Sequence, residues 1–311
     1  MIKIGTDCSG IEAPIHAMNN ICKKYKKKYK HVFSSDIDKY VLDLHKINYN
    51  PSVNFTDITT RDIKKVPNVD VYIAGFPCQP YSRANKYKSL NDKRKNIFYN
   101  CYEVIKHKKP KIFLLENVRT LCSDNKGETF KNILSDLKDL KIYNIYYNIL
   151  NTKDYSVPQS RERLYIIGIL KSCEKKPFEW PKKQKLQPLS KFIDKKKYSK
   201  EPIKDSNKEL FKRVPKDAVY IDVGFRKANY PNSNRWTPCI TTQATMWNFK
   251  KQRMATVNEY LMLQGFPINF FKQNISDHRF KRLIGNSMSV NVIELLLTNC
   301  FLSILYINVK E

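Results

Sequence analysis

The sequence predicts an α/β protein with a doubly wound, mostly parallel sheet and a second, smaller domain. Short apolar segments alternate with helix-like segments through the first 170 residues, as in sheets whose parallel strands are joined by helices. The alternation is lost after about Lys171, where residues 172–217 are rich in Lys, Pro and Ser. A chain of 311 residues is long enough for one large domain with its own core and a smaller one.

Each expected element takes its place in this alternation. The run VDVYIA at 69–74, which ends in a turn, is the clearest strand. In chain order we expect strands at 3–5 and 31–34, strands ending near 74 and 115, and strands at 145–150 and 164–170. Helices are expected at 13–22, 38–47, 98–106 and 129–140. The final apolar run, 290–309, is interrupted by Glu294 and Thr298, so it predicts a helix packed on the first domain and not a membrane span.

The net charge of +28 is the most unusual feature of the composition. Fifty-seven Lys and Arg oppose 29 Asp and Glu, and a field of that sign attracts polyanions such as nucleic acids. The alternative is a compositional bias, because the chain is also rich in Asn, Ile and Tyr. Hydrophobic residues make up 41% of the chain, so a folded protein is expected.

The eight cysteines indicate free thiols and no metal site. The closest two are 14 residues apart, and neither a Cys-x-x-Cys pair nor zinc-like histidine spacing occurs. The N-terminal segment looks like the start of a strand and lacks the apolar core of a signal peptide. We therefore expect an intracellular, reducing compartment, which is the cytoplasm of a prokaryote or of a virus-infected cell, or a nucleus.

Residues 75–82, GFPCQPYS, are the most informative segment. Cys78 follows a predicted strand, and ligands of α/β proteins bind at the carboxyl ends of strands. A thiolate at such a position can act as a nucleophile. Taken alone, the residue could equally be a buried structural cysteine.

Three further segments accompany this one in a fixed order. Residues 111–118 (KIFLLENV) form an apolar strand that ends in a carboxylate, residues 159–168 (QSRERLYIIG) place two arginines before a strand, and residues 285–290 (GNSMSV) are expected to open the C-terminal helix. Together these segments resemble the cytosine-5 DNA methyltransferases, and the resemblance extends from Ile2 to about Val292. It implies a class I S-adenosylmethionine-dependent methyltransferase fold, which is Rossmann-like, with an irregular target-recognition domain.

The resemblance assigns catalytic roles to four residues. Cys78 would attack carbon 6 of the cytosine ring, and Glu116 would donate a proton or hydrogen bond to ring nitrogen 3. Arg163 would hold the base carbonyl and orient Glu116, with Arg161 close by, unless both arginines pair with structural acids or phosphates. The base must be flipped out of the duplex. Residues 83–96 resemble the loop that closes over the flipped base, and Ser82, Arg83 and Arg94 would contact DNA.

The resemblance also places the cofactor, S-adenosylmethionine, at the ends of the first strands. Asp36 would accept from the ribose hydroxyls, Ile37 would pack on adenine, and Asp57 would accept from the adenine amino group. Two departures occur in the first turn, where Cys8 replaces an aromatic residue and Glu12-Ala13 replace a Gly-Gly pair. The full cofactor set is Cys8, Ser9, Gly10, Ile11, Asp36, Ile37, Asp57, Pro77, Ile97, Asn286, Ser287 and Met288.

Target recognition is expected in the basic, irregular part of the chain. Residues 235–243 match a recurrent element of the recognition domain, in which Thr241 would contact the phosphate of the flipped nucleotide. Arg226, Gln243 and Trp247 are candidate DNA contacts, with ordinary packing or surface roles as the alternative. We expect a catalytic and cofactor-binding domain at 1–190, a recognition domain at 191–257, and a return to the catalytic domain at 258–311.

Two alternatives to a DNA methyltransferase remain open on the sequence. A tRNA cytosine-5 methyltransferase of the same family usually carries a Cys-Phe-Thr element that is missing here. A catalytically impaired DNA-binding protein would be suggested by loss of Cys78 or Glu116, yet both are present. The expected partner is double-stranded DNA, with no membrane, no metal and a monomeric protein.

Overall fold

The computed structural model describes residues 1–77, 97–224 and 235–308. The chain divides into two compact units. Unit 1 comprises residues 1–150, 162–182 and 292–311, and unit 2 comprises residues 151–161 and 183–291.

This division differs from the domain boundaries expected from the sequence. Segments 151–161, 183–190 and 258–291 all lie in unit 2. Hydrogen bonds between distant parts of the chain explain the difference, since Gln159 donates to the carbonyl of Leu263 at 2.6 Å and Asn291 donates to the carbonyl of Tyr155 at 2.6 Å. The sequence pattern of these segments gave no sign of such long-range pairing.

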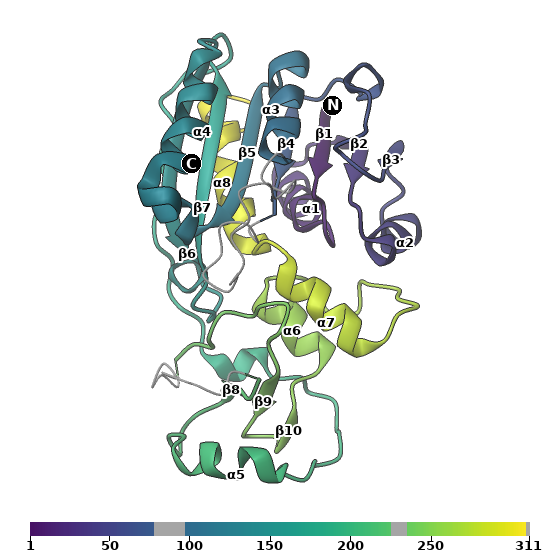
Figure 1. The fold of residues 1–311 in the computed structure, drawn as a ribbon, viewed down its shortest axis with the longest axis vertical. Helices are drawn as coiled ribbons and strands as arrows, with labels where there is room; N and C mark the ends of the chain where they lie inside the picture. Colours follow the sequence, from purple (N-terminus) through teal and green to yellow (C-terminus); the bar gives the residue numbers. More distant parts are fainter. Residues whose placement is uncertain (78–96, 225–234, 309–311) are drawn as a thin grey trace. The chain divides into compact units, whose positions relative to one another are not determined.

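Unit 1 is built on a seven-stranded sheet with the order β3-β2-β1-β4-β5-β7-β6 (Figure 1). The pairs β1–β2, β2–β3, β1–β4 and β4–β5 are parallel, and β5–β7 is antiparallel. The strand order reverses between β1 and β4, which is the switch point where doubly wound sheets bind ligands. The strands are β1 (Ile2–Asp7), β2 (Tyr29–Ser35), β3 (Val53–Phe55), β4 (Val71–Ala74), β5 (Ile112–Val118), β6 (Tyr143–Asn151) and β7 (Glu162–Leu170).

Helices cover this sheet on both faces. The cluster around Phe33, Tyr72 and Phe113 packs against α3 and α4. Asn20 of α1 donates to Glu294 of α8 at 2.7 Å, so these two helices lie side by side. The helices of unit 1 are α1 (Ala13–Tyr25), α2 (Lys39–Asn48), α3 (Ile97–Lys108), α4 (Glu128–Asp139) and most of α8 (Val290–Ser303), with short 3-10 turns at Ile63–Lys65 and Arg119–Gly127. The predicted doubly wound fold is confirmed.

In unit 1 the expected helices and strands agree with the observed ones, with the exception of β3. Strand β3 was missed because it has three residues, all at least partly exposed, and no apolar run. Helix α8 ends at Ser303, and its residues Ile293, Leu297 and Cys300 are buried, as expected for a packed helix. Within the described part of the chain, no helix has the length and apolar character needed to cross a membrane.

Unit 2 has little regular structure. Its antiparallel sheet has the order β10-β9-β8, and a small core forms around Ile221, Val223 and Trp247. The strands are β8 (Tyr220–Asp222), β9 (Met246–Asn248) and β10 (Arg253–Met254); the helices are α5 (Asp205–Lys212), α6 (Val257–Leu263) and α7 (Asp277–Asn286), with 3-10 turns at Thr152–Asp154 and Leu189–Phe192. The irregular character expected for this part of the chain is therefore observed.

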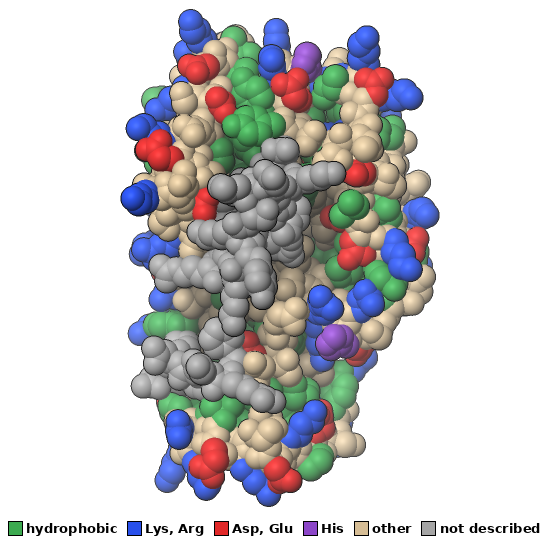
Figure 2. Space-filling model, viewed as in Figure 1, with side chains coloured by type: hydrophobic (Ala, Val, Ile, Leu, Met, Phe, Trp, Pro, Cys, Tyr) green, Lys and Arg blue, Asp and Glu red, His purple; other side chains and the backbone are tan. Residues whose placement is uncertain are grey.

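Basic side chains are widely distributed on the surface. In Figure 2, Lys and Arg lie over both units and do not gather in one patch on the face that is shown. Such a distribution gives a general attraction for polyanions, because the summed field of many charges acts beyond any single contact.

Candidate active site at the carboxyl edge of the sheet

Several predicted site residues follow neighbouring strands of unit 1. Asp36 comes directly after β2, Pro77 lies three residues after β4, and Glu116 lies near the end of β5. The carboxyl ends of parallel strands meet at one edge of a sheet, so these residues share that edge. Cys78, Ser82, Arg83, Arg94 and Arg226 fall outside the described residues.

The turn after β1 and the residue after β2 form one hydrogen-bonded unit. The backbone N–H of Gly10 donates to Asp36 Oδ2 at 2.9 Å, and the N–H of Asp38 donates to Oδ1 at 3.0 Å. Burial raises the pKa of Asp36, and these two backbone bonds partly oppose the rise. A Cβ added to Gly10 would meet no atom within 4 Å, so the turn is open on that side.

These features fit the adenosine part of S-adenosylmethionine. Asp36 offers carboxylate oxygens to hydroxyl groups, and Ile37 beside it is 76% exposed, which is unusual for an apolar side chain next to a buried strand. Asp57 uses one oxygen to accept from the backbone and hydroxyl of Thr59 at 2.8 and 2.7 Å. Its other oxygen makes no hydrogen bond to the described residues.

Other residues of the expected cofactor set have different surroundings. Ile11 is fully buried, so its side chain packs in the core and only its backbone could reach a ligand. Ile97, at the start of α3, is also part of the core. The hydroxyl of Ser9 accepts a hydrogen bond from the backbone N–H of Ser35, the last residue of β2. The thiol of Cys8 is enclosed although part of the residue is exposed, and burial raises its pKa well above the ordinary value.

A buried ion pair beneath the turn was not foreseen. Arg61 donates to both oxygens of Asp7 at 2.6 and 2.8 Å, and the hydroxyl of Tyr72 donates to the same carboxylate at 2.7 Å. The guanidinium also lies over the rings of Phe55 and Phe33, at 5.0 and 5.6 Å. This arrangement fixes the end of β1. Asp7 at the end of a strand was a possible signal, but no motif marks Arg61 as its partner.

Glu116 and Arg163 form the predicted pair. Strand pairing places Glu116 opposite Tyr165 and Arg163 opposite Val118. Arg163 Nε lies 3.2 Å from Glu116 Oε1, and both side chains are largely buried. The two groups are close enough for an ion pair, yet Oε1 makes no aligned hydrogen bond to the described residues. An oriented carboxyl group therefore stands at the carboxyl edge, on the strand next to the one that leads to Cys78.

Arg161 has a different environment from Arg163. It is buried in unit 2, where it donates to the carbonyls of Ile240 at 2.7 Å and Ser287 at 2.6 Å. We had expected it near the base. Its hydrogen bonds go to backbone carbonyls, not to the acids or phosphates of the structural alternative, and they hold distant segments of unit 2 together.

The GNS segment ends α7 and does not open the last helix as we had expected. Gly285 and Asn286 are the final residues of α7, and three residues separate them from α8. A Cβ on Gly285 would lie 2.2 Å from the carbonyl oxygen of Thr241, so only glycine allows this approach. Asn286 is exposed, whereas Ser287 and Met288 are buried. Of the three expected cofactor residues Asn286, Ser287 and Met288, Asn286 is therefore the one whose side chain is accessible to a ligand.

The expected recognition residues differ in exposure. Thr241 and Gln243 are exposed. Trp247 is 5% exposed and packs against Phe211 in the core of unit 2, so the packing alternative is correct for it and a base contact is not. Trp236 was not singled out as a contact, yet Lys153 Nζ lies 4.0 Å from its ring centroid. An aromatic ring with a cation beside it is a feature that nucleic-acid surfaces use.

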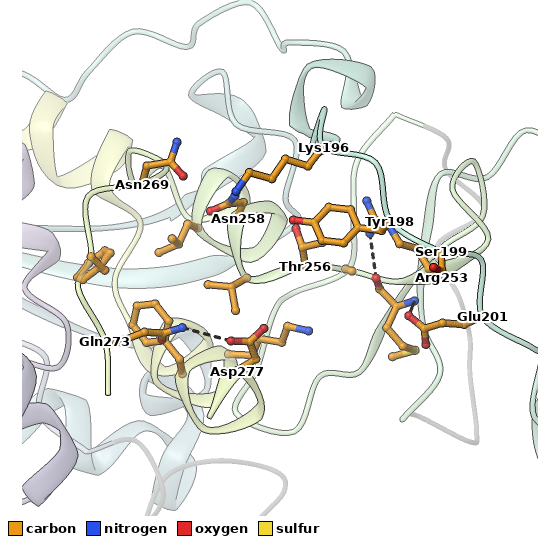
Figure 3. A pocket seen from close by; sticks show the side chains of 17 residues that line it. Lys196, Tyr198, Ser199, Glu201, Arg253, Thr256, Asn258, Asn269, Gln273 and Asp277 are labelled. Atoms are coloured by element: carbon orange, nitrogen blue, oxygen red, sulfur yellow. Dashed lines mark hydrogen bonds between the residues drawn. The ribbon is translucent and has the colours of Figure 1, made fainter. Parts of the chain in front are cut away.

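Unit 2 also contains a pocket of about 520 Å³. Figure 3 shows its polar wall, in which Gln273 donates to Asp277 at 3.2 Å. Lys196 and Lys281 line it as well, but none of the expected catalytic or cofactor residues does. The pocket therefore shares no lining residue with the expected catalytic and cofactor set.

The family follows from comparison with known proteins. The family described as C-5 cytosine-specific DNA methylase matches residues 8–302. The chain belongs to this family. It is therefore a DNA cytosine-5 methyltransferase that uses S-adenosylmethionine as methyl donor.

Two bacterial type II methyltransferases are similar in sequence to most of this chain. Type II methyltransferase M.NgoBI of Neisseria gonorrhoeae is 34% identical over 275 residues, covering 85% of this chain and 83% of that protein. Type II methyltransferase M.HaeII of Haemophilus aegyptius is 36% identical over 277 residues, with the same coverage of 85% and 83%.

Solved structures agree in fold. The Entamoeba histolytica methyltransferase EhMeth has a TM-score of 0.71 at 20% identity, covering 97% of this chain and 98% of that one. The S. pombe Dnmt2 methyltransferase has a TM-score of 0.70 at 18% identity, again covering 97% and 98%. At these identities the likeness concerns the fold. Among the described residues, no group of three or more His, Cys, Asp or Glu side chains could hold a metal ion.

Proposed function

We propose that the enzyme methylates a flipped-out cytosine of double-stranded DNA through a covalent adduct with Cys78. The observation that supports this most directly is the placement of Glu116. Its carboxyl group stands 3.2 Å from Arg163 at the carboxyl end of β5, on the strand beside the one that precedes Cys78. An acid and a nucleophile at one sheet edge are the pair that addition to a cytosine ring requires.

The proposed chemistry begins with the base. The Cys78 thiolate forms a bond to carbon 6, and the charge that develops on the ring is neutralised by a proton from Glu116 at nitrogen 3. Carbon 5 is then an enamine carbon and becomes methylated, with S-adenosylmethionine supplying the methyl group. A base removes the proton from carbon 5, nitrogen 3 returns its proton to the Glu116 carboxylate, and the bond between sulfur and carbon 6 breaks, which regenerates the thiolate.

Arg163 would keep Glu116 in position throughout. Its guanidinium is planar and always charged, so it can hold the carboxyl group and also present a donor to the base carbonyl. We therefore expect Arg163→Lys to lose most of the activity, although the charge is retained.

Trapping of the adduct tests this proposal. DNA that contains 5-fluorocytosine should form a denaturant-stable complex with the wild type in the presence of S-adenosylmethionine, because fluorine cannot leave as a cation. Cys78→Ser should form no complex and still bind unmodified DNA. An active wild type that gives no adduct would show that the covalent mechanism is wrong.

The cofactor is proposed to lie at Asp36, Ile37 and Asp57, with Asn286 and Ser287 toward the methionine end. The open turn at Gly10 and the exposed Ile37 support this placement. Asp36→Ala and Asp57→Ala should each raise the dissociation constant of S-adenosylmethionine by about tenfold or more, since a hydrogen bond to a charged group contributes roughly 1.5–3 kcal/mol. Unchanged affinity in calorimetry for both variants would contradict it.

We further propose that a monomer modifies specific sites in the cytoplasm of a bacterial cell. The relatives that carry type II names come from bacteria. All seven described cysteines are free thiols, which suits a reducing compartment. Bisulfite sequencing of DNA from cells that express the protein would reveal the site, and parallel sequencing of tRNA would test the RNA alternative.

A further inference from the structure

The turn between β1 and α1 has a strained backbone, and it contains Glu12 at a position with positive φ, which a residue other than glycine rarely adopts. Cys8, Gly10 and Glu12 have φ angles of 50°, 50° and 60°, although only Gly10 adopts this region without strain. Glu12 and Ala13 stand where the family usually has a Gly-Gly pair. A backbone of this kind persists only where neighbouring groups fix it.

Hydrogen bonds from α2 and its C-terminal end fix the carbonyls of this turn. His45 Nε2 lies 2.8 Å from the carbonyl oxygen of Gly10, and the hydroxyl of Tyr49 donates to the carbonyl of Ile11 at 2.7 Å. Tyr49 has a single hydroxyl hydrogen, so His16 Nε2, which lies 2.8 Å from that hydroxyl, must be the donor to it. The outer side of the turn is thereby held from α2 and α1.

Glu12 anchors the turn from inside. Its side chain is fully buried, and Oε1 accepts from the hydroxyls of Thr6 at 2.8 Å and Ser34 at 2.5 Å. His31 Nε2 lies 3.4 Å from the same oxygen. Oε2 has no hydrogen-bond partner among the described residues. Burial raises the pKa of Glu12, but His31, His45 and the hydrogen bond from Ser34 lower it by more, so the net pKa lies below its ordinary value.

We propose that Glu12 is a positioning residue for the S-adenosylmethionine site. Its carboxylate fixes the left-handed end of the turn and so keeps the Gly10 N–H on Asp36, 2.9 Å from Oδ2. Without this anchor, Glu12 can relax to an ordinary φ, and the acceptor for the ribose loses its orientation. The inference rests on the proposed cofactor placement at Asp36. In this chain, the hydrogen bonds of the buried Glu12 carboxylate hold the turn in a conformation that a Gly-Gly pair would adopt without strain.

Replacement by alanine tests the anchor separately from the backbone. Glu12→Ala keeps a Cβ and hence the strain at positive φ, whereas glycine would remove both. The dissociation constant of S-adenosylhomocysteine, measured by calorimetry, should rise about tenfold or more, as for loss of a hydrogen bond to a charged group. KM for S-adenosylmethionine should rise similarly, with kcat changed less than about threefold. Glu12→Gln keeps an oxygen for both hydroxyls and should restore binding to within about threefold.

A matched control lies at the opposite edge of the same sheet. Glu174 follows β7, which is antiparallel to β5, and it accepts from Tyr146 at 2.8 Å and from the N–H of Phe178 at 3.1 Å. Glu174→Ala should lower the melting temperature and leave the dissociation constant unchanged. A role of Glu12 in stability alone would give the same pattern for Glu12→Ala, which would overturn the proposal.

Asp36→Asn separates this inference from the proposed site. If it raises the dissociation constant while Glu12→Ala stays within twofold of the wild type, the cofactor site stands and the positioning role is wrong. If neither changes binding, both are wrong. Should Glu12→Ala fail to fold, Ser34→Ala removes the 2.5 Å hydrogen bond to the same oxygen and must raise the dissociation constant in its place.

Discussion

The sheet of unit 1 is packed by apolar side chains, whereas the three short strands of unit 2 depend on buried polar groups. In unit 1, Leu114 and Phe113 are fully buried between helices. In unit 2, Arg253 donates to both oxygens of the buried Glu259 at 2.9 and 3.0 Å, and Arg161 donates to several carbonyls. A large sheet buries enough apolar surface to stabilise itself, but strands of two or three residues do not. We therefore expect the short strands of unit 2 to be more sensitive to the loss of a buried charge than the sheet of unit 1, apart from the Arg61–Asp7 ion pair at the end of β1.

The largest effect is expected from breaking the buried ion pair. Glu259→Ala leaves Arg253 buried without its partner and removes the capping box of α6, in which Glu259 pairs with Thr256. We expect a loss of about 3–5 kcal/mol in the free energy of unfolding, measured by urea denaturation. Asp205→Ala, which removes an exposed pair with Lys208, should cost less than about 1 kcal/mol. Equal effects of both variants would remove the basis of the comparison.

A core truncation in unit 1 should come next. Leu114 is fully buried in β5, and Leu114→Ala should destabilise by about 2–5 kcal/mol through lost transfer energy and a residual cavity. Leu114→Met, which conserves volume, should cost less than about 1.5 kcal/mol. Thermal unfolding with both variants checks this, and a cost near zero for the alanine would show that the core of unit 1 is not closely packed.

Sequence recognition should separate from general DNA affinity within the basic, irregular part of the chain. Phosphate contacts position a protein on DNA, whereas contacts to base edges specify the sequence. Replacing the exposed Gln243 by Ala should change which sites are methylated. Each bidentate base contact contributes about 1–3 kcal/mol of discrimination against the wrong base. Replacing Lys182 and Lys185 by Ala should weaken binding to all DNA and flatten its salt dependence.

Methylation mapping on one mixed-sequence plasmid measures both outcomes. Trp247→Phe provides the control, since Trp247 lies in the core and should affect stability without changing the site pattern. If the pattern is unchanged by substitutions across 235–250 and altered by substitutions in 83–96, recognition belongs to segment 83–96, which follows Cys78 in the sequence.

The smallest expected effect is a change in how the free energy of unfolding depends on pH at acid pH, through Glu12 of unit 1. The pKa of Glu12 is lowered on folding, so its ionised form contributes stability above the ordinary pKa of 4.5, and that contribution is lost as pH falls through the folded value. His31 and His45 face Glu12, and burial lowers the pKa of nearby His16 to about 4. The stability difference between wild type and Glu12→Gln should shrink as the pH falls below the ordinary pKa of 4.5. A difference that grows on acidification would mean that Glu12 is protonated in the native state.

The sequence was sufficient to predict the doubly wound fold and the edge of the sheet to which we assign the candidate site. Strands such as β4 and β5 contain continuous apolar runs; Glu116 lies near the end of β5 and Cys78 follows β4 in the sequence, so the local pattern places both the strands and the candidate chemistry. The pairing of Glu116 with Arg163 was also foreseen, because both belong to motifs whose order is fixed. Local periodicity is strong here since the sheet is buried on both faces.

The tertiary structure alone decided which polar residues pair across the chain. Nothing near Asp7 in the sequence indicates Arg61, and nothing near Glu12 indicates Ser34 and His31, because hydrogen bonds between distant segments leave no periodic trace. Trp247 and Gln243 look alike as recognition candidates until burial separates them. The sequence determines which side chains are available and which strands carry them. Which of these side chains pair with one another is decided by packing, because burying a polar group costs free energy unless a hydrogen-bond partner lies beside it in the folded chain.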